Sequence, residues 1–239
     1  MTVRSVLGLT VKTGQTLGLV GGNLAIDGGI VRAPAGRLEL GSVGTGSQVA
    51  IAPVSSALSS GFGLYYATVQ NFQDIQLSNL ATVRFKCRGG GAIQVQGRRV
   101  EIKDGSALVS DTTEAAFGQD ITVYASEKLV VRGVAPNAAA LLKNGDYDPI
   151  PSRIRAYVTK GATGAGGNIV IKTPTLQLLD GAAIRDSTYG QGNGGNIIVS
   201  ADRIEILGQY GNDDKLQRLP MGSYPQLMRV KRRLPLRVG

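Results

Sequence analysis

Short stretches of alternating apolar and polar residues recur along the chain, and turns rich in Gly, Asn and Asp separate them. After Gly194-Gly195-Asn196 the chain reads I-I-V-S and then R-I-E-I-L, which places Ile197, Val199, Ile204 and Ile206 at every second position. A period of two residues buries one face of an extended segment and exposes the other. The pattern therefore predicts a succession of short β-strands, each with a single apolar face.

The strand pattern is repeated at a fixed spacing. An offset of 28 residues carries Gly166-Gly167-Asn168 onto Gly194-Gly195-Asn196 and Ile169 onto Ile197. The same offset carries Ile93 onto Ile121, with one extra residue before Leu129. Each unit reads as a turn, a strand, a corner, a second strand, a further turn and a third short stretch. The further turn contains Asp-Gly at 104–105 and at 180–181, and this pair supplies the positive φ that a tight corner needs.

Two all-β architectures can produce alternating strands without helices. Asp-Gly turns are frequent in antiparallel hairpins, which would give a sandwich. A solenoid instead places every copy at the same corner, so that the same turn chemistry is required in each winding. The repeat therefore favours a parallel β-helix with ladders of Ile and Val inside and stacked Asn at the corners. At about 25 residues per winding, residues 1–207 would form roughly eight windings.

Two segments and the end of the chain depart from the repeat. Residues 52–63 and 135–157 are predicted to be irregular loops inserted between strands, the second with a short helical turn at 138–142. Residues 209–239 show no alternation and no Gly-Gly-Asn corner. We therefore predict a β-helix over 1–208, followed by a basic, poorly ordered tail over 209–239.

Charge and composition narrow the classes of function. Lys and Arg exceed Asp and Glu by 19 − 15 = 4 in residues 1–207 and by 7 − 2 = 5 in residues 208–239, so the body is only weakly basic. This distribution does not predict a specific nucleic-acid partner. No apolar run is long enough for a transmembrane helix. The 34 glycines fit a chain with many turns.

The titratable residues argue against metal sites and common nucleophilic catalysis. The chain has no His and a single cysteine, Cys87, which we expect to be a small buried residue. A zinc site and a Ser-His-Asp or Cys-His centre are therefore excluded. The Gly-rich turns precede strands rather than helices, so they do not predict a phosphate-binding loop. We expect no cofactor and no metal.

A paired-carboxylate enzyme is the alternative to a non-enzymatic protein. Asp180 and Asp186 would suit a polysaccharide-active, pectate-lyase-like β-helix if they lay close together on one outer face. However, Asp180 occupies the same turn as Asp104 in another unit, which favours a structural role. For binding, the two predicted loops and their neighbourhoods offer exposed aromatic and basic side chains, namely Tyr65, Tyr66, Tyr147, Arg153 and Arg155.

Several phrases together resemble filamentous-haemagglutinin-like exoproteins of two-partner secretion systems, in their Gly-rich cyanobacterial form. They are GGNLAIDGGIVRAPAGRLELGSV, NFQDIQLSNLATV, GAIQVQGRRVEIKDGSALVS and YGQGNGGNIIVSADRIEI. The resemblance implies a right-handed parallel β-helix, export through a dedicated outer-membrane β-barrel transporter, and a secreted or cell-surface adhesin outside the Gram-negative outer membrane. Its expected partners are that transporter and a surface receptor or glycan.

The chain also departs from the family pattern. No signal peptide is recognisable, and the amino-terminal part of the secretion domain with its asparagine-proline-type motif is missing. We therefore expect a fragment of such an exoprotein that is non-enzymatic and mediates attachment to surfaces, cells or glycans.

Overall fold

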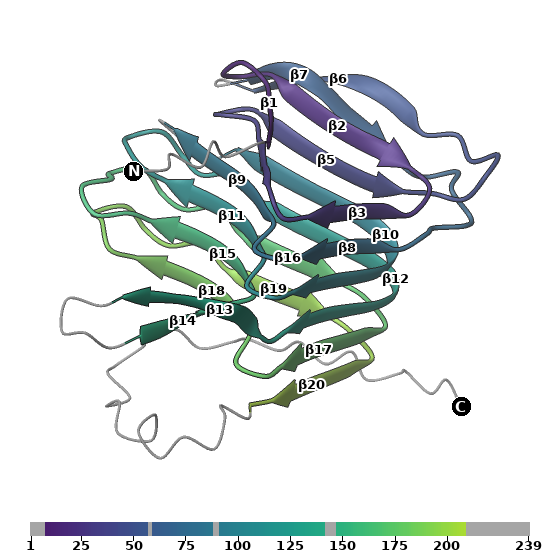
Figure 1. The fold of residues 1–239 in the computed structure, drawn as a ribbon. Helices are drawn as coiled ribbons and strands as arrows, with labels where there is room; N and C mark the ends of the chain where they lie inside the picture. Colours follow the sequence, from purple (N-terminus) through teal and green to yellow (C-terminus); the bar gives the residue numbers. More distant parts are fainter. Residues whose placement is uncertain (1–7, 57–58, 88–90, 142–146, 209–239) are drawn as a thin grey trace, which may run out of the picture.

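The computed structural model describes residues 8–56, 59–87, 91–141 and 147–208, and this part of the chain contains strands and no helix. The chain winds repeatedly around a common axis, so that strands of successive windings lie side by side (Figure 1). All strand pairs between windings are parallel, apart from two inserted hairpins and one isolated bridge. This confirms the predicted all-β, parallel solenoid.

Each winding contributes strands to three faces. Face 1 contains β2 (Thr16–Gly21), β5 (Arg37–Ser42), the first halves of β10 (Ala92–Lys103) and β12 (Ile121–Arg132), β16 (Ile169–Lys172) and β19 (Ile197–Ser200). Face 2 contains β3 (Leu24–Asp27), β8 (Ile75–Ser78), the second halves of β10 and β12, β17 (Thr175–Leu179) and β20 (Arg203–Leu207). Face 3 contains β1 (Gly8–Thr10), β4 (Ile30–Arg32), β9 (Thr82–Cys87), β11 (Ala107–Thr112), β15 (Arg153–Val158) and β18 (Ala183–Thr188).

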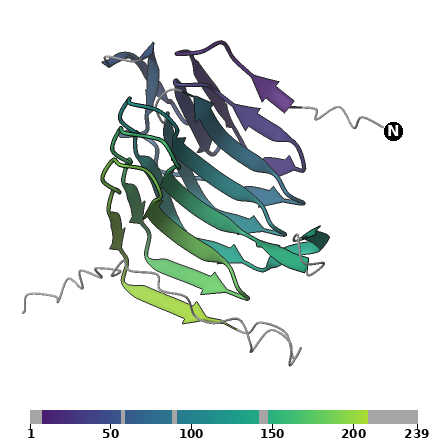
Figure 2. The same ribbon diagram turned by 90° about the vertical axis from the view of Figure 1, so that its left-hand side faces the viewer.

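The register between windings follows the sequence repeat. Ile169 lies opposite Ile197, and Ile93 lies opposite Ile121, as the offset of 28 predicts. The extra residue expected before Leu129 appears as a shift in register after Gly97. Figure 2 shows the stacked windings from the N-terminal to the C-terminal end of the described chain.

The predicted number of eight windings is wrong. The described residues form five windings with all three strands, which begin at β2, β5, β10, β12 and β16. Two partial windings contain β1 at one end and β19 and β20 at the other. The difference arises because hairpins lengthen two windings. Equivalent residues Leu38 and Ile93 are 55 positions apart, and Ile121 and Ile169 are 48 apart, whereas Ile169 and Ile197 are 28 apart.

The core consists of aliphatic columns that run along the stack. On face 1 one column contains Leu38, Ile93, Ile121 and Ile169, all at most 1% exposed. Burial of each such side chain contributes roughly 1.5–3 kcal/mol. The columns exist because alternate residues of every strand point inward and equivalent positions stack, which is the ladder that the alternation predicted.

Two kinds of corner repeat with the windings. Asp104 and Asp180 have φ of 54 and 53 and precede Gly105 and Gly181 with φ of 75 and 78, which confirms the predicted left-handed turn. At the other corner the side-chain amide of Asn196 donates to Oδ1 of Asn168 at 3.1 Å, and that of Asn168 donates to Oδ1 of Asp120 at 3.0 Å. The predicted stacking of Asn is therefore confirmed.

The Gly-Gly-Asn phrase also has a steric reason. A Cβ atom on Gly195 would overlap with the carbonyl oxygen of Gly167 in the adjacent winding. A Cβ atom on Gly167 would overlap in the same way with the carbonyl oxygen of Gln119. The glycine recurs because the backbones of adjacent windings approach closely at this corner.

Both predicted loops are different from what the sequence suggested. The first insertion is an antiparallel hairpin of β6 (Ala50–Ser56) and β7 (Ser59–Tyr65), and the second is a hairpin of β13 (Val134–Leu141) and β14 (Tyr147–Pro151). Residues 138–141 lie in β13, so the helical turn is wrong. Residues 153–157 belong to β15, a regular strand of face 3. The division at residue 208 stays a prediction, because residues 209–239 lie outside the described residues.

Candidate functional site on an arginine-lined face

The structure distributes the five residues predicted to bind over the first hairpin and the position directly after it, the second hairpin, and face 3. Tyr65 is the last residue of β7 and is 49% exposed, whereas Tyr66 directly follows it and is 8% exposed. Tyr147 begins β14, and its side chain lies outside the described residues. Arg153 and Arg155 lie two residues apart on β15, on a different face from Tyr65.

Tyr66 is part of the contact between the first hairpin and face 1. It packs in a small apolar cluster with Val43, Leu64 and Val69. Beneath the hairpin lies Glu39, which is fully buried and forms an ion pair with Arg37. Burial raises the pKa of the Glu39 carboxyl, and burial together with the Glu39 charge raises the pKa of Tyr66. These groups hold the hairpin on the solenoid and are not accessible to a large ligand.

Arg155 belongs to a column of arginines on the outer side of face 3. Parallel pairing places Arg32 beside Arg84, Arg84 beside Val109, Val109 beside Arg155, and Arg155 beside Arg185. Four of the five strands in this column, β9, β11, β15 and β18, follow one another down one side of the molecule in Figure 1, and β11 contributes Val109. We call Arg32, Arg84, Arg153, Arg155 and Arg185 the arginine stripe.

Local sequence explains why these side chains point outward. In four strands an inward apolar residue immediately precedes the arginine: Val31-Arg32, Val83-Arg84, Ile154-Arg155 and Ile184-Arg185. Val109 takes the outward position in the intervening strand, yet it is 4% exposed. Its neighbours in register are Arg84 and Arg155, whose aliphatic stems are suited to cover it.

Arginines of the stripe lie beside one another in register, and a carboxylate pairs with one of them. Asp111 on β11 accepts a hydrogen bond from Arg155 at 2.6 Å. The buried Nε atoms of Arg32, Arg84, Arg153 and Arg155 have no hydrogen-bond partner in the described structure. Burial lowers the pKa of Arg84, and the charges of Arg32 and Arg155 lower it further. The pKa of Arg153 is likewise lowered, first by burial and then by Arg155.

Aromatic side chains extend the stripe at its C-terminal end. The Arg155 guanidinium lies 4.9 Å from the centroid of the Tyr157 ring. The rings of Tyr157 and Tyr189 meet edge to face with their centroids 5.5 Å apart, and Tyr189 is 59% exposed. Cation and aromatic faces are therefore presented side by side.

Sequence reasoning found two of the five arginines in the stripe. Arg32, Arg84 and Arg185 are far apart along the chain, and no local pattern links them. The available signal was the apolar-Arg pair in the third strand of four windings. This signal becomes meaningful only once the register of those strands is known, because pairing then places the arginines in one column.

The two carboxylates of the enzyme alternative do not share an outer face. Asp180 occupies an exposed corner, whereas Asp186 lies opposite Ala156 in an inward column and is 7% exposed. Neither oxygen of Asp186 has a hydrogen-bond partner of good geometry. Burial raises the pKa of Asp186 to about 6, and the nearby backbone amide of Gly195 opposes the rise. This arrangement does not provide the paired carboxylates that the alternative requires.

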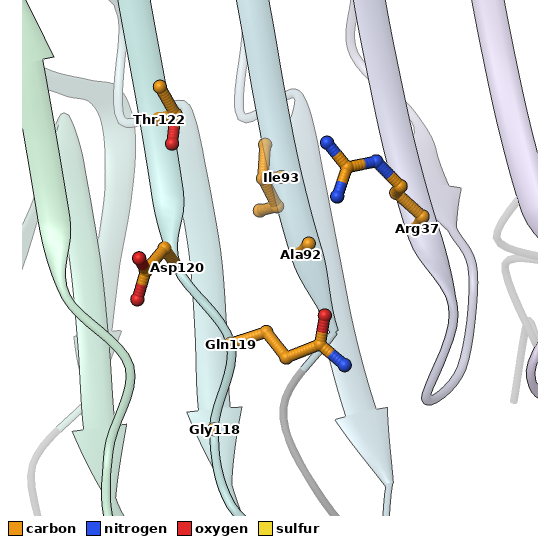
Figure 3. A pocket seen from close by; sticks show the side chains of 7 residues that line it. All are labelled: Arg37, Ala92, Ile93, Gly118, Gln119, Asp120 and Thr122. Atoms are coloured by element: carbon orange, nitrogen blue, oxygen red, sulfur yellow. The ribbon is translucent and has the colours of Figure 1, made fainter. Parts of the chain in front are cut away.

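A shallow depression on face 1 offers little chemistry. It is lined by residues of β5, β10 and β12 and of the turn before β12, and Figure 3 shows Arg37 and Asp120 at its sides. Arg37 is paired with Glu39, and Asp120 accepts hydrogen bonds from Asn168.

Among the described residues no group of three or more His, Cys, Asp or Glu could hold a metal ion. The described chain also contains no helix able to cross a membrane. Cys87 ends β9, and its side chain lies outside the described residues.

The architecture defines a class of protein, a parallel β solenoid with inserted hairpins. Residues 2–95 match the TPS secretion domain, a region that runs through β9 and into β10. This match supports the resemblance to two-partner secretion exoproteins that the sequence predicted. Exoproteins with this domain are secreted with the help of a transporter partner and are generally non-enzymatic. No curated protein and no solved structure is significantly similar to the chain.

Proposed function

We propose that the protein is a non-enzymatic adhesin that is exported through an outer-membrane β-barrel transporter and attaches cells to surfaces, cells or glycans. The observation that carries this proposal is the match of residues 2–95 to the TPS secretion domain, which supports a secreted protein. The solenoid suits this role because a stack of windings is stiff and offers a long side surface.

Attachment of cells is the direct test. Microspheres coated with the purified chain are expected to adhere to glycan-covered cells, and microspheres coated with an unrelated protein of similar charge are the control. Equal adhesion of the two preparations would count against the adhesin. Release of reducing ends from acidic polysaccharides by the same protein would instead favour the enzyme alternative.

The second hairpin can be tested separately from the solenoid. The amide of Ser152 donates to the carbonyl oxygen of Gly133 at 2.9 Å, so the two ends of the hairpin already meet. Residues 134–151 can therefore be deleted by joining Gly133 to Ser152. Deleting 135–157 would be unsuitable, because it removes most of β15. The excised protein is expected to keep its far-ultraviolet spectrum and to lose adhesion if the hairpin contacts the receptor.

A further inference from the structure

We infer that the arginine stripe binds a linear acidic polysaccharide, one with a carboxylate or sulfate group on successive sugars, whose chain runs along the stack of windings. The inference rests on the proposed attachment function and names the ligand class and the surface that takes it. It adds Arg32, Arg84 and Arg185 to the arginines that the sequence suggested.

Unsatisfied donors point to an anionic ligand. The Nε atoms of Arg32 and Arg84 lack a partner, and within the described residues neither arginine forms an ion pair. A guanidinium group presents several N–H donors in a rigid fork that matches the two oxygens of a carboxylate or sulfate. The Nε atoms themselves are buried, so a bound oxyanion would meet the outer N–H groups of the forks and would also reduce the repulsion between neighbouring arginines.

The spacing of the charges points to a polymer. Adjacent strands in a sheet lie about 4.8 Å apart, so Arg32 and Arg84 form one close pair and Arg155 and Arg185 form another. Val109 occupies the position between the pairs, which separates Arg84 from Arg155 by about 10 Å. The column spans five windings, or about 19 Å. One small anion would reach one pair, whereas a polymer with repeated acidic groups can reach both.

The aromatic end of the stripe favours sugar over nucleic acid. Tyr157 and the exposed Tyr189 present ring faces and edges beside Arg155, and an apolar sugar face can pack there. A DNA duplex carries one charge per about 1.7 Å on a curved cylinder, which a single straight column fits poorly. Binding of single strands requires aromatic side chains for successive bases. In the described structure the Arg155 guanidinium lies over the Tyr157 ring, which therefore already has a cation on one face.

The stripe crosses the boundary of the matched secretion domain. Arg32 and Arg84 lie inside residues 2–95, whereas Arg153, Arg155 and Arg185 lie beyond them. The repeat windings thus continue the same charged column beyond the matched region. A binding surface that functions only within the secretion domain would not need arginines beyond the matched region.

Face 2 provides a matched control for net charge. Arg99 donates to Glu127 at 2.7 Å, and Arg132 donates to Glu101 at 2.7 Å. The double variant Arg32→Gln/Arg84→Gln and the control Arg99→Gln/Arg132→Gln therefore remove the same charge from different faces. Arg155 is left intact in both, because its loss would leave Asp111 buried without its cation.

The experiment measures binding of the purified full chain to polygalacturonate, dextran sulfate, neutral dextran and a single-stranded oligonucleotide at fixed salt. We expect Arg32→Gln/Arg84→Gln to weaken binding of an acidic polysaccharide about tenfold and the control to weaken it less than about threefold. The tighter of the two acidic polymers identifies the acidic group. Affinity is expected to increase with oligosaccharide length until the chain spans the stripe.

Several results would overturn the inference. Equal weakening by the two double variants would show that binding follows net charge and not the stripe. Equal affinity for neutral dextran, or tighter binding of the oligonucleotide, would reject the ligand class. If the Gln variant fails to fold, Arg32→Lys/Arg84→Lys keeps the charge and loses the fork, and unchanged affinity of that variant would reject bidentate recognition. The assay contains no cells, so polysaccharide binding without adhesion would refute the proposed function alone.

Discussion

Faces 2 and 3 of the solenoid both carry arginines at outward positions, but the arginines have different partners. On face 2, Arg99 and Arg132 each pair with a glutamate from a neighbouring winding. On face 3, Arg32 stands in register with Arg84, whereas Asp111 pairs with Arg155. Both faces bury mainly aliphatic side chains, with Asp186 as an inward carboxylate of face 3, and their outward charges differ in how they are paired.

The arginines of face 2 are used in ion pairs that stabilise the sheet, whereas Arg32 and Arg84 on face 3 remain available to a ligand. A cross-strand pair of opposite charge stabilises a sheet modestly, and like charges side by side destabilise it. Face 2 follows the favourable arrangement, whereas face 3 keeps the unfavourable one over several windings. A surface on which arginines repel one another is suited to an anionic partner, because its charge would reduce that repulsion.

The largest effect is expected from removing the carboxylate of face 3. Asp111→Asn should lower the free energy of unfolding by about 2–3 kcal/mol, because it leaves a partly buried Arg155 without its anion. Glu101→Gln on face 2 should cost less than about 1 kcal/mol, because its partner Arg132 is more exposed than Arg155. Urea unfolding of both variants measures the two losses. Equal losses would remove the proposed contrast between the faces.

The same substitution also sharpens the binding hypothesis. Asp111→Asn removes negative charge from the stripe, so affinity for an acidic polysaccharide should increase even though stability falls. Partial unfolding would lower both affinity and stability, so it does not explain an affinity that increases while stability falls. A parallel fall in affinity and stability would indicate that Asp111 only holds the face together.

Asp186 tests a carboxylate that is buried without a cation. Its pKa of about 6 lies above the ordinary 3.8, so its contribution to stability is fully present below pH 4 and is lost as pH rises through 6. Asp186→Asn should raise the free energy of unfolding by about 2 kcal/mol at pH 8 and change it little at pH 4. Thermal unfolding across this pH range measures the effect. A gain of the same size at both pH values would contradict the titration of Asp186.

The smallest effect compares single arginines on the two faces. Arg84→Gln removes repulsion with Arg32 and Arg155, and we expect it to stabilise the protein by less than about 1 kcal/mol. Arg132→Gln removes a pair with Glu101 and should destabilise it by a similar amount. Added salt should reduce both differences by screening. Effects of the same sign would show that the faces do not differ electrostatically.

Much of the fold follows from local patterns. Alternation in I-V-I-K and I-I-V-S identifies the strands, and the recurrence of Gly-Gly-Asn and Asp-Gly identifies the corners and the register of Ile169 with Ile197. The hairpins were harder to predict because β13 contains Pro136 and three consecutive alanines, which weaken the strand pattern. Antiparallel pairing with β14 supplies the hydrogen bonds that local propensity does not.

The candidate site was harder to predict from the sequence than the fold, because it depends on which strands lie side by side. Arg153 and Arg155 could be found as a basic pair, but Arg32 and Arg185 are 153 positions apart and share a column only through four successive strand pairings. The sequence by itself determined that the chain would stack equivalent strands, because alternation and repeated corners act within each winding. The structure decided which charges became neighbours, because each inserted hairpin changes the number of residues between one winding and the next.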